Sequence, residues 1–252
     1  MVNANCSARW VDPGYDDPAV GWHHCPPGMG IYQPVILEAR STLFVHDLFV
    51  RPLPDDGAAE AWIEVWNADI ERRPVNVTVS VYGRNFEAAV CEDVDVACPG
   101  PMGPRVNFLR TRIDMPEHRA WEPDTPWLYQ AQVTLRGEDG ALLDAAERQF
   151  GMRTFAMDEE GSPKGMLRLN GRPIRLRGAN TMGHEQVAVM RGDERQLHDD
   201  ILITKLCHMN FWRITQRPVQ EEVYEACDRL GLMTQTDLPL FGVLRRNQFC
   251  EA

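Results

Sequence analysis

The stretch Arg175-Leu-Arg-Gly-Ala-Asn-Thr-Met-Gly-His-Glu-Gln186 separates two different patterns in this sequence. Short strands and turns are predicted before it, whereas single strands alternate with single helices after it. The pair Asn170-Gly171 precedes it, between the alternating apolar residues of Met166–Ile174, and this is a strong signal of a β-hairpin. We therefore expect a hairpin, then a strand from Ile174 to Gly178, and then a polar loop that carries Asn180, His184 and Glu185.

An amphipathic helix is predicted after this loop. Asp193 stands where its carboxylate can accept hydrogen bonds from the first free N–H groups, and Gln196 occupies the capping-box position, so the helix should begin near Glu194. Its apolar face is expected to contain Leu197, Ile201, Leu202, Leu206 and Met209.

A strand, a second helix and a third strand complete the pattern. Phe211–Thr215 is the strand, and the second helix should place Pro218 at its first helical position and end at Gly231. The third strand, Leu232–Thr236, is followed by Asp237.

This alternation predicts parallel strands that are joined by right-handed crossovers. It fits half of a doubly wound sheet or about three-eighths of a (β/α)₈ barrel. A complete barrel takes around 250 residues, and about 87 residues follow Gly165. We therefore expect the sequence to stop within this domain.

The preceding region is predicted to be all-β. Val75, Val77, Val79 and Val81 alternate with polar residues and should share one buried face of a strand. Turn signals occur at Asp55–Gly57 and at Gly137–Gly140. The predicted strands are Leu43–Val50, Ala61–Trp66, Val75–Tyr82, Arg105–Ile113, Leu128–Leu135 and Leu142–Phe150. Their number and spacing are typical of an immunoglobulin-like sandwich, with Cys91–Gly103 as an exposed loop.

The first 40 residues differ from the rest, because they are rich in Pro, Gly and aromatic residues and show little periodic order. A segment of about 40 residues cannot bury a core of its own. We expect it to lie on a core that other residues supply.

The composition excludes several classes of protein. Hydrophobic residues make up 44% and charged residues 25% of the 252 residues, as in an ordinary globular protein. A formal net charge of -11 without clusters of Lys and Arg argues against nucleic-acid binding. Neither a membrane-spanning apolar run nor an export signal at Met1 is predicted.

The seven cysteines are odd in number and contain no CxxC pair, which indicates free thiols in a reducing compartment such as the cytoplasm. A Cys91–Cys98 disulfide is the alternative that spacing allows. His23, His24 and Cys25 lack a third ligand at a suitable spacing, so no metal site is predicted there.

A series of local motifs resembles glycoside hydrolase family 2, the family of the β-galactosidases, β-glucuronidases and β-mannosidases. The motifs follow the family's order along nearly the whole chain, which makes the set far more specific than any one of them. They are Pro26–Val35, Asp47–Pro52, Trp121–Tyr129, Phe150–Phe155, Leu169–Ile174, Arg177–Asn180 and Cys227–Leu232.

The resemblance implies three domains within a multidomain α+β chain. Residues 1–40 would be the end of a jelly-roll sugar-binding domain, residues 41–155 an immunoglobulin-like sandwich, and residues 156–252 the first part of a (β/α)₈ (TIM) barrel. The intact protein is expected to act on carbohydrates, with no nucleic-acid or membrane partner, and to form a homo-oligomer.

The family's mechanism is retaining hydrolysis of β-linked glycosides by two glutamates, which such chemistry requires about 5 to 5.5 Å apart. In the family, one follows an Asn at the end of the fourth barrel strand and the other comes later. The resemblance therefore implies that this sequence contains neither catalytic residue and is inactive alone. The competing hypothesis is a noncatalytic carbohydrate-binding or interaction module.

The resemblance also implies residues of a substrate-binding rim, because barrel enzymes place their sites at the carboxyl ends of the strands. Arg213 matches the family's arginine that orients the catalytic carboxylates. Gln216 replaces a histidine of the β-galactosidase motif, and Met182 and Gly183 disturb the spacing before the family's histidine. The predicted rim contains Asn180, His184, Glu185, Arg213, Gln216 and Asp237.

Structural explanations for the same residues remain open. Arg213 is also explained as a strand-end arginine paired with an acid, Asp237 as a turn or capping residue, and His184 with Glu185 as an exposed loop. The segment Thr236–Gly242 lacks the Glu and His that bind magnesium in some β-galactosidases, so neither a metal nor another cofactor is predicted.

Overall fold

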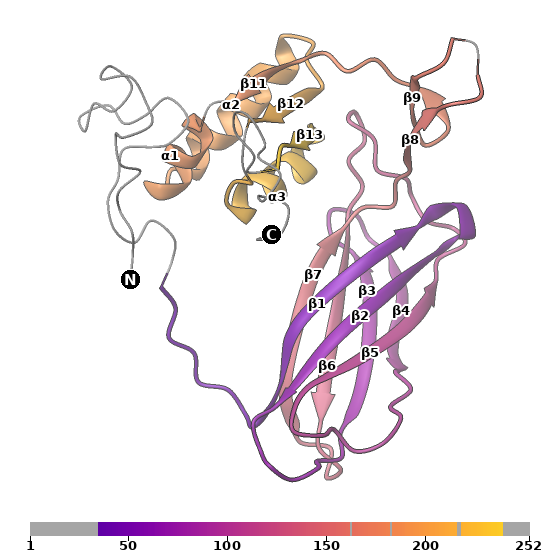
Figure 1. Cartoon of the computed structure of the whole chain (residues 1–252), viewed down its shortest axis with the longest axis vertical. Helices are drawn as coiled ribbons and strands as arrows, with labels where there is room; N and C mark the ends of the chain where they lie inside the picture. The colour runs from indigo at the N-terminus through magenta and orange to yellow at the C-terminus, as the bar shows by residue number, and fades with distance from the viewer. Residues whose placement is uncertain (1–34, 162, 182, 216–217, 239–252) are drawn as a thin grey trace, which may run out of the picture. The chain divides into compact units, whose positions relative to one another are not determined.

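The structure is a computed structural model that describes residues 35–161, 163–181, 183–215 and 218–238 (Figure 1). Two compact units make up the chain: one is Leu37–Arg175, and the other combines Met1–Ile36 with Leu176–Ala252. The predicted jelly-roll segment lies almost entirely outside the described residues.

The first unit contains a sandwich of two antiparallel sheets, which Figure 1 shows face to face. One sheet has the order β1-β2-β5 and the other the order β4-β3-β6-β7. The strands are β1 (Leu43–Leu53), β2 (Ala58–Asn67), β3 (Asn76–Gly83), β4 (Ala89–Asp95), β5 (Arg105–Asp114), β6 (Tyr129–Arg136) and β7 (Leu142–Phe150). All six strands predicted for this region are confirmed.

The core of the sandwich follows from the alternation of apolar residues. Val75, Val77, Val79 and Val81 are buried as predicted, and Ile63 of β2 is fully buried in the same core cluster. Burying a side chain of this kind stabilises the fold by about 2 kcal/mol. The opposite face of the β1-β2-β5 sheet is not wholly polar, because Phe49 and Phe108 are about half exposed there.

Both predicted turns are confirmed. The one-turn helix η1 (Pro54–Asp56) ends at Gly57, which adopts a left-handed φ of 57° and donates its N–H to the carbonyl of Pro54. Between β6 and β7 the N–H of Gly140 donates to the carbonyl of Gly137 over 2.9 Å.

The prediction that Cys91–Gly103 is an exposed loop is wrong for its first part. Residues 91–95 belong to β4, which pairs with β3 through an irregular register and has Asp93 at a φ of 46°. An edge strand with a bulge faces solvent for most of its length, so it lacks alternation and tolerates acids. The loop that follows is anchored by the buried side chains of Val96 and Met102.

The predicted hairpin is confirmed in a small sheet of the order β10-β9-β8. It consists of β8 (Phe155–Asp158), β9 (Met166–Leu169) and β10 (Arg172–Pro173). Asn170 and Gly171 form its two-residue turn with φ values of 49° and 75°, the left-handed pair that suits a hairpin. The Asn170 amide also bonds the backbone of Thr154 and Trp121.

The second unit alternates strands and helices, and its three strands pair in parallel in the order β11-β12-β13, as predicted. Its elements are β11 (Gly178–Thr181), α1 (His184–Met190), α2 (Glu194–Leu206), β12 (Phe211–Ile214), α3 (Glu221–Leu230) and β13 (Met233–Thr236).

The predicted strand Ile174–Gly178 is wrong, because β11 begins four residues later, at Gly178, and ends three residues later, at Thr181. At Gly178 the strand lies so close to β12 that an added Cβ would come within 1.8 Å of the Phe211 carbonyl oxygen, so this position requires glycine. Asn180 is inside this strand. His184 and Glu185 lie in α1, a helix that the sequence did not predict, because its N-cap residue Gly183 provides no capping side chain.

The predicted start of α2 is confirmed, since the Asp193 carboxylate accepts a hydrogen bond from the N–H of Gln196. Leu197 and Ile201 are buried as expected. Leu202 and Leu206 are exposed, the latter by 78%, because α2 is packed along one side only. The predicted apolar face is therefore too wide.

Helix α3 ends at Gly231, as predicted, with a left-handed φ of 74°. Its start differs from the prediction, because Gln220 is the N-cap and Pro218 precedes the helix. Two acids, Glu221 and Glu222, occupy the first turn, where the helix dipole favours negative charge.

Within the described residues no helix is both long and apolar enough to cross a membrane.

Candidate functional site

Most predicted rim residues lie at or near the carboxyl edge of the parallel sheet. The strand register places Asn180 of β11 beside Arg213 of β12, and Arg213 beside Gln235 of β13. Parallel neighbours at the same register lie about 4.8 Å apart and share a face of the sheet. The three residues thus form one polar row across the three strands.

Arg213 and Asp237 are joined by a bidentate ion pair. The Nε and Nη2 atoms of Arg213 donate to Oδ1 and Oδ2 of Asp237 over 3.1 and 2.5 Å. Asp237 directly follows β13, and its N–H donates to the Ile214 carbonyl. A bidentate fork of this kind fixes the guanidinium plane.

This ion pair leaves part of Arg213 accessible, because 40% of the arginine side chain is exposed against 17% for Asp237. The two bonds to the carboxylate use two of the five guanidinium N–H donors. The pair can therefore present a fixed cation with further donors to an anionic or hydroxyl-bearing group.

Gln235 is a member of this cluster that the sequence did not predict. Its Nε2 lies 3.4 Å from Oδ1 of Asp237, within hydrogen-bonding distance. Residues two apart on a strand share a face, so the spacing from Gln235 to Asp237 was the signal that could have identified it. Gln216 lies outside the described residues.

His184 and Glu185 form a second group in the first turn of α1. The Nδ1 atom of His184 lies 3.3 Å from Oε2 of Glu185. The histidine side chain is 57% exposed, whereas the glutamate side chain is only 1% exposed. The edge of the His184 ring packs against Trp212 of β12, with the ring centroids 6.2 Å apart.

The Glu185 carboxylate is buried near Cys227 of α3. Burial, with the nearby Asp228 and Glu185 carboxylates, raises the pKa of the Cys227 thiol well above its usual range. Among the described residues, neither carboxylate oxygen of Glu185 makes a hydrogen bond. Burying a carboxylate without hydrogen bonds lowers the stability of a fold. Glu185 is therefore an unusual residue for this position.

The described part of the chain contains no group of three or more His, Cys, Asp or Glu side chains that could hold a metal ion. Its four cysteines, Cys91, Cys98, Cys207 and Cys227, are free thiols. The Cys91–Cys98 disulfide that spacing allowed is therefore not formed.

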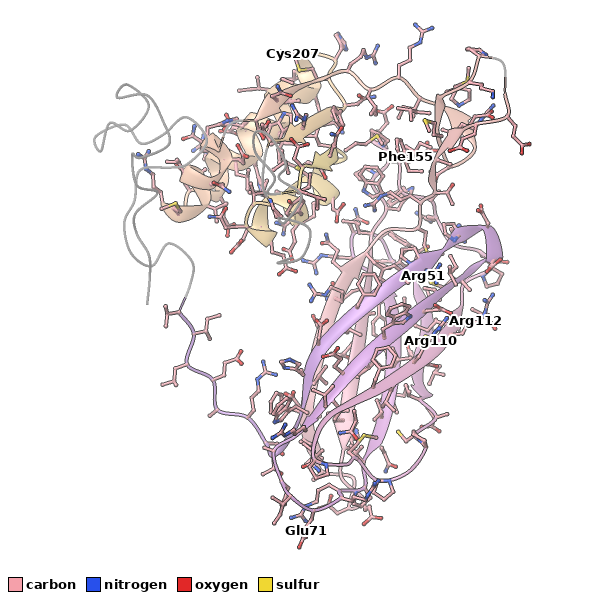
Figure 2. The ribbon with its side chains drawn as sticks, viewed as in Figure 1. Arg51, Glu71, Arg110, Arg112, Phe155 and Cys207 are labelled. Carbon is pink, nitrogen blue, oxygen red and sulfur yellow. The ribbon has the colours of Figure 1, made fainter. Side chains whose placement is uncertain are left out.

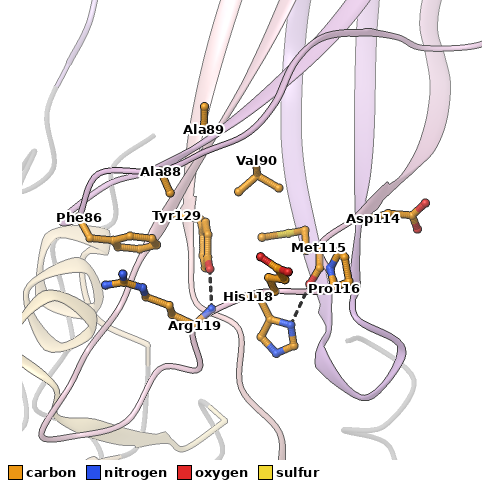
Figure 3. A pocket seen from close by; sticks show the side chains of 11 residues that line it. Phe86, Ala88, Ala89, Val90, Asp114, Met115, Pro116, His118, Arg119 and Tyr129 are labelled. Carbon is orange, nitrogen blue, oxygen red and sulfur yellow. Dashed lines mark hydrogen bonds between the residues drawn. The ribbon is translucent and has the colours of Figure 1, made fainter.

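The sandwich has a cavity of about 390 Å³, which Figure 3 shows from close by. Its floor includes Val90 and Met115, and the Tyr129 hydroxyl accepts a hydrogen bond from the Arg119 N–H over 2.7 Å. The Arg119 guanidinium stacks on the ring of Phe86. None of the predicted rim residues lines this cavity.

Comparison with known families covers most of the chain. The model described as "Glycosyl hydrolases family 2" matches residues 43–153. The model described as "Glycosyl hydrolases family 2, TIM barrel domain" matches residues 163–251.

Solved structures with a similar fold include two β-glucuronidases and a β-glycosidase. A β-glucuronidase of Bacteroides uniformis is 23% identical over 81% of this chain and 24% of its own, with a TM-score of 0.58. A β-glycosidase of Bacteroides vulgatus is 21% identical over 84% and 26%, with a TM-score of 0.63. A Bifidobacterium dentium β-glucuronidase complexed with coumarin-3-O-glucuronide is 19% identical over 78% and 31%, with a TM-score of 0.58. The chain thus spans about a quarter of the length of the structures it matches.

Proposed function

Because this chain belongs to the glycosyl hydrolases of family 2, we propose that it is part of a retaining glycosidase that cleaves β-linked sugars. Two glutamates act in such a reaction: one protonates the leaving oxygen, and the other forms a covalent glycosyl-enzyme intermediate that water then hydrolyses. In this proposal both glutamates lie outside the present sequence. The chain contributes the sandwich and one wall of the substrate site.

We assign residues 41–155 to the immunoglobulin-like sandwich, residues 156–252 to the barrel, and residues 1–40 to the end of a preceding jelly-roll domain. The family-model matches at 43–153 and 163–251 support the first two limits. The four free thiols agree with a reducing compartment such as the cytoplasm.

The observation that carries the proposal is that Asn180, Arg213 and Asp237 come together at the carboxyl edge of three parallel strands. In a (β/α)₈ barrel this edge holds the active site. Asp237 fixes the guanidinium plane, so that the remaining N–H donors of Arg213 can orient a catalytic carboxylate. Asn180 and His184, both exposed, are proposed to contact sugar hydroxyls, and Gln216 is proposed to do so from its sequence position.

The proposal is tested by the complete polypeptide that contains this sequence, assayed with a panel of chromogenic β-glycosides. Arg213→Lys should lower kcat/KM about 100-fold, because an ammonium cannot reproduce the bidentate fork. Arg195→Lys is the matched control, since Arg195 is exposed on α2 and pairs only loosely with Asp199. Equal activity of the two variants would contradict the role of Arg213, and turnover by the 252-residue chain alone would contradict the placement of the catalytic pair.

One observation favours the alternative of a noncatalytic carbohydrate-binding module. The outer face of the β1-β2-β5 sheet exposes Phe49 and Phe108, which flank Trp62 with ring centroids 5.6 and 6.0 Å from it. Figure 2 shows Arg51, Arg110 and Arg112 on the same sandwich. Aromatic rings beside hydrogen-bond donors are suited to packing against sugars.

Titration calorimetry of the 252-residue chain with β-linked oligosaccharides distinguishes this alternative. Binding that Phe108→Ala abolishes and Phe155→Ala preserves would support a binding module, because both phenylalanines are half-exposed but lie on different sheets. Absence of binding, with turnover by the complete polypeptide, would support the enzyme.

A further inference from the structure

The carboxylate of Glu185 is almost inaccessible to solvent, because its side chain is only 1% exposed. It also lies near the buried thiol of Cys227, which belongs to the apolar cluster of this unit. Removing a carboxylate from water costs several kcal/mol unless it is paired and hydrogen-bonded. A position of this kind indicates a specific partner.

Among the described residues, the neighbouring imidazole is a basic group in contact with this carboxylate. Nδ1 of His184 is 3.3 Å from Oε2 of Glu185, but the two groups are not aligned as a hydrogen bond in this structure; such bonds are often poorly aligned until substrate binds. The other ring nitrogen, Nε2, lies on the opposite side of the imidazole from Nδ1. Because 57% of the histidine side chain is exposed, a ligand can reach the ring.

Neighbouring groups do not compete for this imidazole. The Cys227 thiol stays protonated, because burial and the carboxylates of Asp228 and Glu185 raise its pKa. The Trp212 and His184 rings are steeply inclined, with an interplanar angle of 74°, and the indole N–H of Trp212 is already donated to the Thr204 hydroxyl over 3.0 Å. The His184 ring thus contacts the Trp212 ring and the buried Glu185 carboxylate.

From this geometry we propose that Glu185 is a positioning residue that sets the orientation and tautomer of His184. The inference rests on the function proposed above. In the neutral imidazole one nitrogen donates and the other accepts. If Nδ1–H donates to Glu185, then Nε2 carries the lone pair and accepts a hydrogen bond from a sugar hydroxyl. Second residues behind a functional histidine commonly act in this way.

The first test needs no catalytic activity. Long-range ¹H–¹⁵N spectra of the 252-residue chain at about pH 8.5, where an ordinary imidazole is neutral, report which ring nitrogen carries the proton. His184, assigned by its loss in His184→Gln, should have the proton on Nδ1. Glu185→Leu should move it to Nε2, whereas Glu185→Gln, whose amide oxygen accepts the same bond, should leave it on Nδ1. A wild-type His184 with its proton on Nε2 would overturn the proposal.

The second test uses the complete polypeptide and its best glycoside. Glu185→Leu should raise KM about tenfold and change kcat less than threefold, and Glu185→Gln should retain both values within threefold. Glu194→Leu is the control, because Glu194 is also an acid in the first turn of a helix, α2, but is exposed. If Glu185→Leu does not fold, Glu185→Met replaces it, and the wild-type spectrum still decides the tautomer.

The two tests separate the inference from the proposed function. If the expected tautomer is observed but the complete polypeptide has no glycosidase activity, the positioning role of Glu185 is kept and the proposed glycosidase function is rejected. Glycosidase activity that is unchanged in Glu185→Leu would keep the enzyme and reject the positioning role. A loss of thermal stability in both Glu185 variants with unchanged KM would show that the carboxylate is only structural.

Discussion

The antiparallel sandwich and the parallel sheet differ in how far their own residues bury them. In the sandwich, alternate residues of β2, β3 and β6 are buried against the facing sheet. In the parallel sheet, β11 has one buried residue of four and β13 has none. Parallel sheets in known folds are covered on both faces. The two sheets of the sandwich thus bury each other's apolar residues, whereas most residues of β11 and β13 are not buried.

The candidate site lies in the less buried of the two regions. Arg213, Asn180 and His184 all belong to the parallel unit, where polar side chains are accessible. Functional residues tend to occur in regions that are less stable than the surrounding scaffold. The comparison therefore predicts that equivalent substitutions will cost more stability in the sandwich than in the parallel unit.

The largest expected effect is a cavity in the sandwich. Ile63→Ala should destabilise this unit by about 4 kcal/mol, because Ile63 is fully buried in an extended core. Ile201→Ala, in the smaller cluster of the parallel unit, should cost about 2 kcal/mol, because exposed neighbours allow partial collapse. Hydrogen exchange by mass spectrometry measures each unit separately. Ile70→Ala, on the surface, is the control, and equal losses at Ile63 and Ile201 would break the comparison.

A backbone contact in the parallel sheet should give the next largest effect. Gly178→Ala should cost about 3 kcal/mol, because its Cβ would meet the Phe211 carbonyl oxygen at 1.8 Å and push β11 away from β12. Faster exchange should then be confined to the peptides of β11 and β12. Gly103→Ala, with its nearest neighbour at 3.7 Å, should change little. A neutral Gly178→Ala would mean that the two strands are not in contact.

The cap of α2 should have a smaller effect. Asp193→Ala removes the carboxylate that accepts the Gln196 N–H and should cost about 1 kcal/mol. Helix α3 has no side-chain bond at its N-cap Gln220, so Gln220→Ala tests a cap without that bond. Amide exchange in the first turn of each helix provides the measurement. Protection that falls equally in both helices would contradict the assigned capping role.

The smallest effect concerns pH. Hydrogen bonds from Arg168 and from the Gly161 N–H lower the pKa of Asp158 below its usual value. The stability from this carboxylate is present above the unfolded pKa of about 3.9 and is lost as the pH falls through the lower folded value. Asp158→Asn should therefore reduce the difference in Tm between pH 7 and pH 3. Glu159→Gln, on the neighbouring exposed residue, should not.

Most of the fold could be predicted because it depends on local signals. The four alternating valines of the β3 region, the Asn170-Gly171 turn, the Asp193 cap and the Gly231 stop all act within a few residues of themselves. The errors arise where distant contacts decide. Strand β4 is an irregular edge without alternation, and the position of β11 depends on the contact between Gly178 and Phe211.

The site shows the same division. Strand ends could be placed from periodicity, so Arg213 and Asp237 could be assigned to one edge. That they form a bidentate pair depends on the register between β12 and β13, which no local pattern determines. The burial of Glu185 depends on α1, a helix of only seven residues that begins without a capping side chain.

Two thiols of the parallel unit, Cys207 and Cys227, differ in accessibility, so their reactivity can measure how often α3 separates from the rest of this unit. Cys207 is exposed just after α2, while Cys227 is buried in α3 with a raised pKa. A small alkylating reagent should modify Cys207 in the native protein at the rate of a free thiol. Modification of Cys227 must instead wait until α3 separates from its neighbours. The ratio of the two rates, followed by mass spectrometry, then measures how often this half of the molecule opens.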